Sequence, residues 1–181
     1  MSDSTILLLS GSLRKGSYNR MLLAEAKRVY GDATFLEGDL KLPLYDGDDE
    51  EANGVPDAVT TLADQIAQAD AVILSSPEYN KGITGVLKNA LDWLSRTKTN
   101  PLADKPVLVM SANMGRTGGE SGQLMTRTCL VPHQARVIPG PLLTIAQAHE
   151  AFDDEGHLKN EMSQKMLSGL IDRLKKEIAL G

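Results

Sequence analysis

The stretch that decides the fold is residues 5–19, which read Thr5-Ile-Leu-Leu-Leu-Ser-Gly-Ser-Leu-Arg-Lys-Gly-Ser-Tyr-Asn19. Its opening run, through Leu9, is apolar on both faces, which is typical of a strand buried inside a parallel sheet. A turn rich in glycine and serine follows, and a helical pattern then runs from about Asn19 to Tyr30. The stretch therefore predicts a strand, a loop and a helix in succession.

The same alternation of short apolar runs and helical patterns continues along the chain. It predicts further strands at residues 33–36, 71–74, 106–110 and 135–138, and helices at 56–66, 83–94, 121–130 and 162–178. The apolar stripe expected for the last helix consists of Met162, Met166, Leu170, Leu174 and Ile178. Residues 37–55 show no clean period, so we expect an irregular excursion there.

Strands that alternate with helices predict an α/β fold with a parallel sheet and helices on both faces. Five strands favour the flavodoxin-like winding, and the length of 181 residues suits a single domain spanning 1–181. In such sheets, ligands bind beyond the carboxyl ends of the strands. We therefore expect the loops after the first, third and fourth strands to converge on a site.

Charge and composition exclude several classes of protein. The formal net charge is −5, which disfavours a nucleic-acid binder because such proteins usually need a basic face. No stretch is long and apolar enough for a membrane span or a secretory signal. A single cysteine, Cys129, fits a reducing compartment, so we expect a cytoplasmic protein.

The loop after the first strand has the composition of a phosphate cradle. Serine hydroxyls, backbone N–H groups and a helix N-terminus favour an anion there, and Arg14 can add a charged contact. The alternative is a turn that only caps the helix. Gly11 and Gly16 have P-loop spacing, but Ser17 and Tyr18 replace the Lys and Ser/Thr that a P-loop requires. The dinucleotide-binding pattern G-x-G-x-x-G also fails after Gly11.

A family resemblance enters at the loop after the third strand. Pro77-Glu-Tyr-Asn80, with Gly82, Gly85 and the run 87–94, resembles the signature of the NAD(P)H-dependent FMN reductase family. Residues 11–19 resemble the FMN-phosphate loop of that family, and residues 111–119 resemble its third flavin loop. The family includes quinone, chromate and ferric reductases.

The resemblance implies a set of cofactor-binding residues and no catalytic side chain, because FMN itself carries the hydride chemistry. The implied FMN phosphate ligands are Ser10, Ser12, Arg14, Ser17, Tyr18 and Asn19. The implied ribityl and ring contacts are Pro77, Glu78, Tyr79, Asn80, Ser111, Gly115 and Arg116. By the same analogy, Arg96 lies near a pocket rim and guides an anionic substrate, although a solvated helix-terminal arginine is an equal alternative. No metal site is expected, because the histidines lack ligand spacing.

The function that follows is NAD(P)H oxidation coupled to reduction of quinones, chromate, ferric chelates or flavins through FMN. Such an enzyme would need no protein partner beyond its own copies, and the resembling family implies a homodimer or homotetramer. One alternative is a flavodoxin-type electron carrier that does not oxidise nicotinamide nucleotides itself. Another is an FMN-free phosphate-binding module with the same winding. Flavodoxins tend to flank the ring with aromatic residues, and these loops offer only Tyr79, which favours the enzyme.

Overall fold

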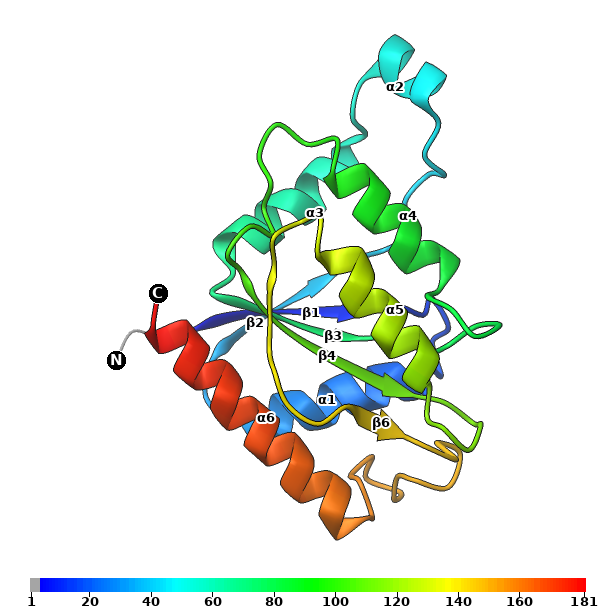
Figure 1. Cartoon of the computed structure of the whole chain (residues 1–181), viewed down its shortest axis with the longest axis vertical. Coiled ribbons are helices and arrows are strands. Elements are labelled where there is room, and N and C mark those ends of the chain that lie inside the picture. The colour runs from blue at the N-terminus through cyan, green and yellow to red at the C-terminus, as the bar shows by residue number, and fades with distance from the viewer. Residues whose placement is uncertain (1–3) are drawn as a thin grey trace.

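The computed structural model describes residues 4–181, and a parallel sheet forms its centre (Figure 1). The strands are β1 (Thr5–Ser10), β2 (Thr34–Gly38), β3 (Ala71–Ser75), β4 (Pro106–Ala112), β5 (Arg136–Val137) and β6 (Leu143–Ile145). The helices are α1 (Tyr18–Tyr30), α2 (Gly47–Asn53), α3 (Asp57–Gln68), α4 (Gly85–Leu94), α5 (Glu120–Leu130) and α6 (Glu161–Ala179).

The strand order is β2-β1-β3-β4-β5, and every pair is parallel. This order is that of the flavodoxin-like winding, so the predicted fold class is confirmed. The direction of winding reverses between β1 and β3, which pair in the register Ser10 with Ser75 at their carboxyl ends. The loops after these two strands therefore start side by side.

The fifth strand position is divided, which the sequence analysis did not predict. β5 pairs with Pro106–Val107 at the start of β4, and β6 pairs with Met110–Ala112 at its end. The linking residues include Pro139 and Pro141. Proline has no N–H to donate to a neighbouring strand. The hydrogen-bonded pairing with β4 is therefore interrupted between β5 and β6 and resumes at Leu143. Within residues 4–181 the sheet thus has six strands in five positions.

Helices cover both faces of the sheet. α1 and α6 lie on one face, and α3, α4 and α5 lie on the other (Figure 1). Ile6 and Leu8 of β1 belong to the core under the first pair, whereas Leu7 and Leu9 belong to the core under the second group. β1 is buried on both faces, as its apolar run predicted, because side chains alternate across a strand.

The expected irregular excursion contains a helix, so that part of the prediction was wrong. α2 projects away from the body, and none of its residues is buried (Figure 1). Asp46 caps it by accepting a hydrogen bond from the N–H of Asp48 at 2.9 Å. Acidic residues in the first turn also interact favourably with the helix dipole. The cap and the charges thus stabilise α2. Because α2 has no apolar stripe, the periodicity of the sequence did not predict it.

The last predicted helix is present as α6, but its apolar stripe is different from the one expected. Met162 is 72% exposed, while the buried positions are Leu167, Leu170, Ile171 and Leu174. Each step of four residues turns about 40° beyond a full circle, so a stripe spaced only by fours drifts off the buried face. No helix among residues 4–181 is both long and apolar enough to cross a membrane.

Candidate functional site

The three predicted loops converge at the carboxyl ends of β1, β3 and β4 and enclose a cleft of about 210 Å³. Its lining residues are Ser12, Arg14, Ser17, Tyr18, Asn19, Pro77, Tyr79, Ala112, Asn113, Met114 and Gly115. These residues come from the first loop with the start of α1, from the loop after β3, and from the end of β4 with the loop that follows. The expected convergence is therefore present.

The first loop presents an electropositive concavity at the start of α1. Ser17 caps the helix, and its Oγ accepts a hydrogen bond from the N–H of Asn19 at 3.2 Å. Within residues 4–181, the backbone N–H groups of 15–18 donate to no protein acceptor. These donors lie at the positive end of the helix dipole, beside the exposed Arg14 and Lys15. The loop therefore fits a phosphate group.

Asn19 joins the start of α1 to two of the strand ends that carry the cleft, those of β3 and β4. Its side chain is buried, and its Nδ2 donates to the carbonyl of Ala112 at 2.8 Å. Its Oδ1 accepts from the Ser75 Oγ at 2.8 Å and from the N–H of Ala112 at 3.0 Å. These three bonds tie the start of α1 to the carboxyl ends of β3 and β4. The Asn19 side chain thus holds these segments together beside the cleft.

Ser10 and Ser111 do not line the cleft. The Ser10 hydroxyl donates to the carbonyl of Ser12 at 3.1 Å and accepts from its N–H at 3.3 Å. The Ser111 hydroxyl donates to the carbonyl of Gly118 at 2.8 Å and accepts from Nε2 of Gln123 at 3.3 Å. Each serine therefore fixes the loop that follows its own strand.

The loop after β3 forms a tight hairpin at the mouth of the cleft. Tyr79 and Gly82 exchange two backbone hydrogen bonds, of 3.1 and 3.0 Å. Between them, Asn80 and Lys81 have φ values of 52° and 66°, the conformation of a type I′ turn. Asn80 stands at the tip of this turn and does not line the cleft, whereas Tyr79 does and remains 49% exposed.

Glu78 holds the same loop against α5. Its side chain is 8% exposed, and its carboxylate accepts a hydrogen bond from the N–H of Gly122 at 3.0 Å. Asn113 Oδ1 accepts from the N–H of Glu78 at 3.3 Å, and Asn113 Nδ2 donates to the Glu78 carbonyl at 3.0 Å. Asn113 was missed by the sequence analysis, although it lies in the third motif directly after a strand. The loops after β3 and β4 are thereby joined into one wall.

Two predicted arginines lie outside the lining. Arg116 is exposed on the loop after β4. Arg96, two residues after the end of α4, forms an ion pair through its Nε with the carboxylate of Glu50 in α2 at 2.9 Å. The Tyr45 hydroxyl donates to the same carboxylate at 3.1 Å, and this hydrogen bond raises the pKa of Tyr45. Arg96 therefore anchors α2 to the body of the protein in this structure.

The described part of the chain has no cluster of three or more His, Cys, Asp or Glu residues that could hold a metal ion. Cys129 is partly buried and packs against the core beneath α3, α4 and α5. The groups that the cleft offers to a ligand include its backbone donors, its hydroxyls and the Arg14 guanidinium.

Comparisons with known proteins agree with this geometry. A family model described as NADPH-dependent FMN reductase matches residues 4–150. An NAD(P)H-dependent FMN reductase of Pseudomonas aeruginosa is 37% identical over 174 residues, which cover 95% of this chain and 94% of the relative. A quinone reductase of Escherichia coli is 42% identical over 139 residues, which cover 75% of this chain and 74% of the relative.

The fold has a close relative among solved structures. The flavoenzyme NAD(P)H:(acceptor) oxidoreductase FerB of Paracoccus denitrificans superposes with a TM-score of 0.87 at 30% identity, covering 98% of both chains. The family match, the sequence relatives and this superposition span the elements that build the cleft. The chain therefore belongs to the NADPH-dependent FMN reductase family, a family of oxidoreductases.

Proposed function

We propose that the protein oxidises NAD(P)H and reduces quinones, in two successive half-reactions at one site. Relatives that cover most of the chain are named NAD(P)H-dependent FMN reductase and quinone reductase, which supports this assignment. Chromate, ferric chelates and free flavins are further candidate acceptors. When bound, FMN would supply the ability to accept a hydride and pass on two electrons.

The observation that carries the proposal is the anion cradle at the start of α1. In the proposal, Ser12, Arg14, Ser17 and Tyr18 hold the FMN phosphate. The backbone N–H groups of 15–18 supply donors that no protein acceptor within residues 4–181 uses. A dianionic phosphate gains both from these donors and from the Arg14 guanidinium.

The other two loops supply the walls for a planar ring. Pro77 and Tyr79 line one side of the cleft, and Asn113, Met114 and Gly115 line the other. Glycine at 115 lets backbone approach a ring closely, since no Cβ intervenes. Asn80 and Arg116 stay proposed contacts from the same loops. In the proposal, four further residues hold these loops in position through their hydrogen bonds: Ser10, Asn19, Glu78 and Ser111.

The mouth of the cleft suits an exchange of substrates. Tyr79 is 49% exposed and Met114 is 60% exposed, so apolar surface flanks the opening. An aromatic and a thioether side chain favour a flat, weakly polar partner such as a quinone or a nicotinamide ring. NAD(P)H and the acceptor would occupy this opening in turn. The scheme assigns no catalytic role to a side chain, because FMN itself would carry the hydride chemistry.

The proposal also covers the domain organisation, the oligomeric state and the cellular location of the protein. We take residues 1–181 as a single flavodoxin-like domain that forms a homodimer or homotetramer, as the resembling family implies. A cytoplasmic location is supported by the single cysteine, because disulfide-poor chains suit a reducing compartment. The acidic net charge of −5 supports partners that are small molecules rather than nucleic acids.

The test is to identify the bound flavin and to measure steady-state oxidation of NADH and NADPH with a panel of acceptors. We expect denaturation to release FMN rather than FAD, and we expect turnover with quinones. A protein that cannot be reconstituted with FMN would contradict the cofactor assignment. FMN binding without NAD(P)H oxidation by any acceptor would instead identify a flavodoxin-type electron carrier.

A further inference from the structure

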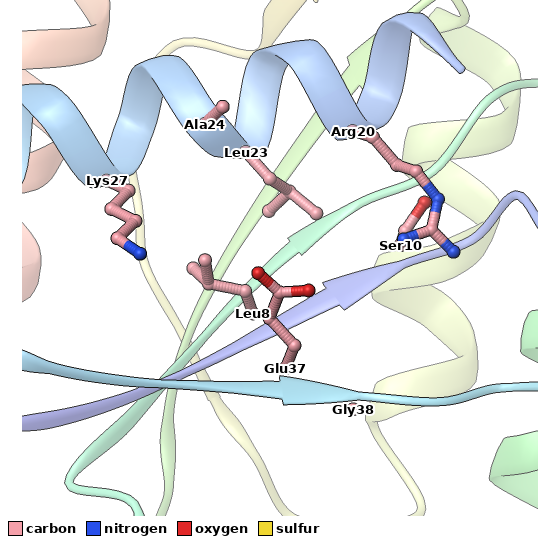
Figure 2. Close-up of a pocket in the computed structure, with 8 residues that line it drawn as sticks. All are labelled: Leu8, Ser10, Arg20, Leu23, Ala24, Lys27, Glu37 and Gly38. Carbon is pink, nitrogen blue, oxygen red and sulfur yellow. The ribbon is translucent and has the colours of Figure 1, made fainter. Parts of the chain in front are cut away.

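A second cleft, of about 190 Å³, lies between α1 and β2 (Figure 2). It is lined by Leu8, Ser10, Arg20, Leu23, Ala24, Lys27, Glu37 and Gly38. None of these residues lines the first cleft. Because β2 is the edge strand of the sheet, one side of this second cleft opens to solvent.

Three charged side chains face the second cleft without pairing to one another. Among residues 4–181, Arg20, Lys27 and Glu37 form no ion pair. Figure 2 shows the Glu37 carboxylate rising from the strand toward α1, with Arg20 turned toward Ser10 on one side and Lys27 on the other. The two cations are seven residues apart on one helix, a rise of roughly 10 Å. A ligand between them would meet a cation at each end and an acceptor in the middle.

The floor of the second cleft is apolar. Leu8 of β1 and Leu23 of α1 are buried, and Ala24 completes the surface between the two cations. Lys27 is held near this floor by its contact with Phe35, whose ring centroid lies 5.2 Å from Nζ. Carbon atoms of a ligand can therefore rest on hydrocarbon while its polar groups face the charges.

The charges narrow the ligand chemistry. A carboxylate only accepts hydrogen bonds, so Glu37 needs hydroxyl or ammonium donors opposite it. A guanidinium fork suits a phosphate in particular. Glu37 also stands near the carboxyl end of β2, beside β1, and ligands of doubly wound sheets bind at the carboxyl ends of the strands.

We propose that the second cleft is a binding site for a ribose phosphate, either free or as part of a nucleotide. Arg20 binds the phosphate near the start of α1, Glu37 accepts from the sugar hydroxyls, and Lys27 donates to the sugar from the far end. Leu8 and Leu23 support the C–H face of the sugar. The residues that line this site are distinct from those that line the first cleft.

The test is isothermal titration calorimetry on FMN-saturated protein, with ribose 5-phosphate, ribose and inorganic phosphate as separate probes. Saturation with FMN keeps the probes out of the first phosphate cradle. We expect saturable binding of ribose 5-phosphate, roughly tenfold tighter than that of either part alone. Arg20→Ala should weaken it roughly tenfold or more, because a charged donor is lost. Glu37→Gln should reduce the preference over inorganic phosphate, whereas the matched control Lys165→Ala should change nothing.

Three results would overturn the proposal. The first is the absence of saturable ribose 5-phosphate binding to the wild-type protein. The second is binding that both Arg20→Ala and Glu37→Gln leave unchanged at equal melting temperature. The third is inorganic phosphate binding as tightly as ribose 5-phosphate. Competition between ribose 5-phosphate and NADH would show that the ribose phosphate belongs to the nicotinamide nucleotide, and non-competition would show a free ligand.

Discussion

The carboxylate of Glu78 accepts a hydrogen bond from the backbone N–H of Gly122 at 3.0 Å. The bond links the flavin loop after β3 to the first turn of α5, where a carboxylate also meets the positive end of the helix dipole. The two segments pack closely, because a Cβ on Gly122 would come within 2.9 Å of Glu78 Cα and Cβ. A motif residue predicted to edge the flavin thus joins two walls of the cleft.

Glu78→Ala should therefore lower both stability and FMN affinity. We expect a loss of about 1–2 kcal/mol in the free energy of unfolding, because the N–H of Gly122 loses its partner in a buried site. Glu78→Gln keeps an acceptor oxygen and should lose less. Chemical denaturation and flavin-fluorescence titration measure the two effects, with the exposed Glu120→Gln as control. Equal behaviour of Glu78→Ala and the control would disprove the linking role.

Arg14→Ala should weaken FMN binding without a large change in stability. Arg14 is exposed and lines the phosphate cradle, so its removal costs a charged contact to the phosphate rather than core packing. Such a loss amounts to about 1.5–3 kcal/mol, roughly ten- to hundredfold in affinity. The exposed Lys165 lies on α6 and does not line the cleft, so Lys165→Ala is the control. An unchanged dissociation constant for Arg14→Ala would show that the backbone donors suffice.

Arg96→Ala and Glu50→Gln should have the same effect, because the two side chains form one ion pair. We expect faster amide hydrogen exchange in α2 in both variants, with FMN content unchanged. The sequence suggested instead that Arg96 guides an anionic substrate, and this role predicts a different result. In that case Arg96→Ala alone would alter the acceptor or nucleotide kinetics, and Glu50→Gln would leave them at wild-type values.

Glu25 should make stability depend on pH in the acid range. The hydrogen bond from Arg28, at 2.7 Å, is the main cause that lowers the pKa of Glu25 below its usual value. The ionised Glu25 therefore stabilises the folded protein at pH values above its unfolded-state pKa of about 4.3. This contribution is lost as the pH falls through the lower pKa of the folded state. Glu25→Gln should therefore be less stable than wild type at pH 7, by about 1–2 kcal/mol. This difference should shrink below about pH 4 when thermal melts are compared. A difference that stays constant across the acid range would contradict the assignment.

The sheet and the position of the cleft were predictable because their signals are local. Apolar runs such as 5–9 and 71–74 are typical of strands buried in a parallel sheet, and the rule for carboxyl ends then places the loops together. The division of the last strand position was less visible, since it depends on pairing between segments 30 or more residues apart in sequence. α2 was missed because it has a cap and charges but no apolar face.

The roles of individual side chains could be predicted less well than the location of the site. Asn19 and Glu78 lie in motifs that indicate FMN, yet their side chains bind other parts of the protein. The partners of Asn19, Ala112 and Ser75, are 93 and 56 residues away in sequence, so no local pattern could reveal them. The cleft at Arg20 and Glu37 also depends on the packing of α1 against an edge strand, which appears only in the folded chain.

The most direct test of the central claim is anaerobic stopped-flow absorbance of the FMN-loaded protein, mixed first with NADH or NADPH and then with a quinone. The account predicts that the nucleotide bleaches the visible flavin absorbance and that the quinone restores it, with no other protein present. Absorbance that neither nucleotide bleaches, or that a quinone restores only after a second protein is added, would contradict it.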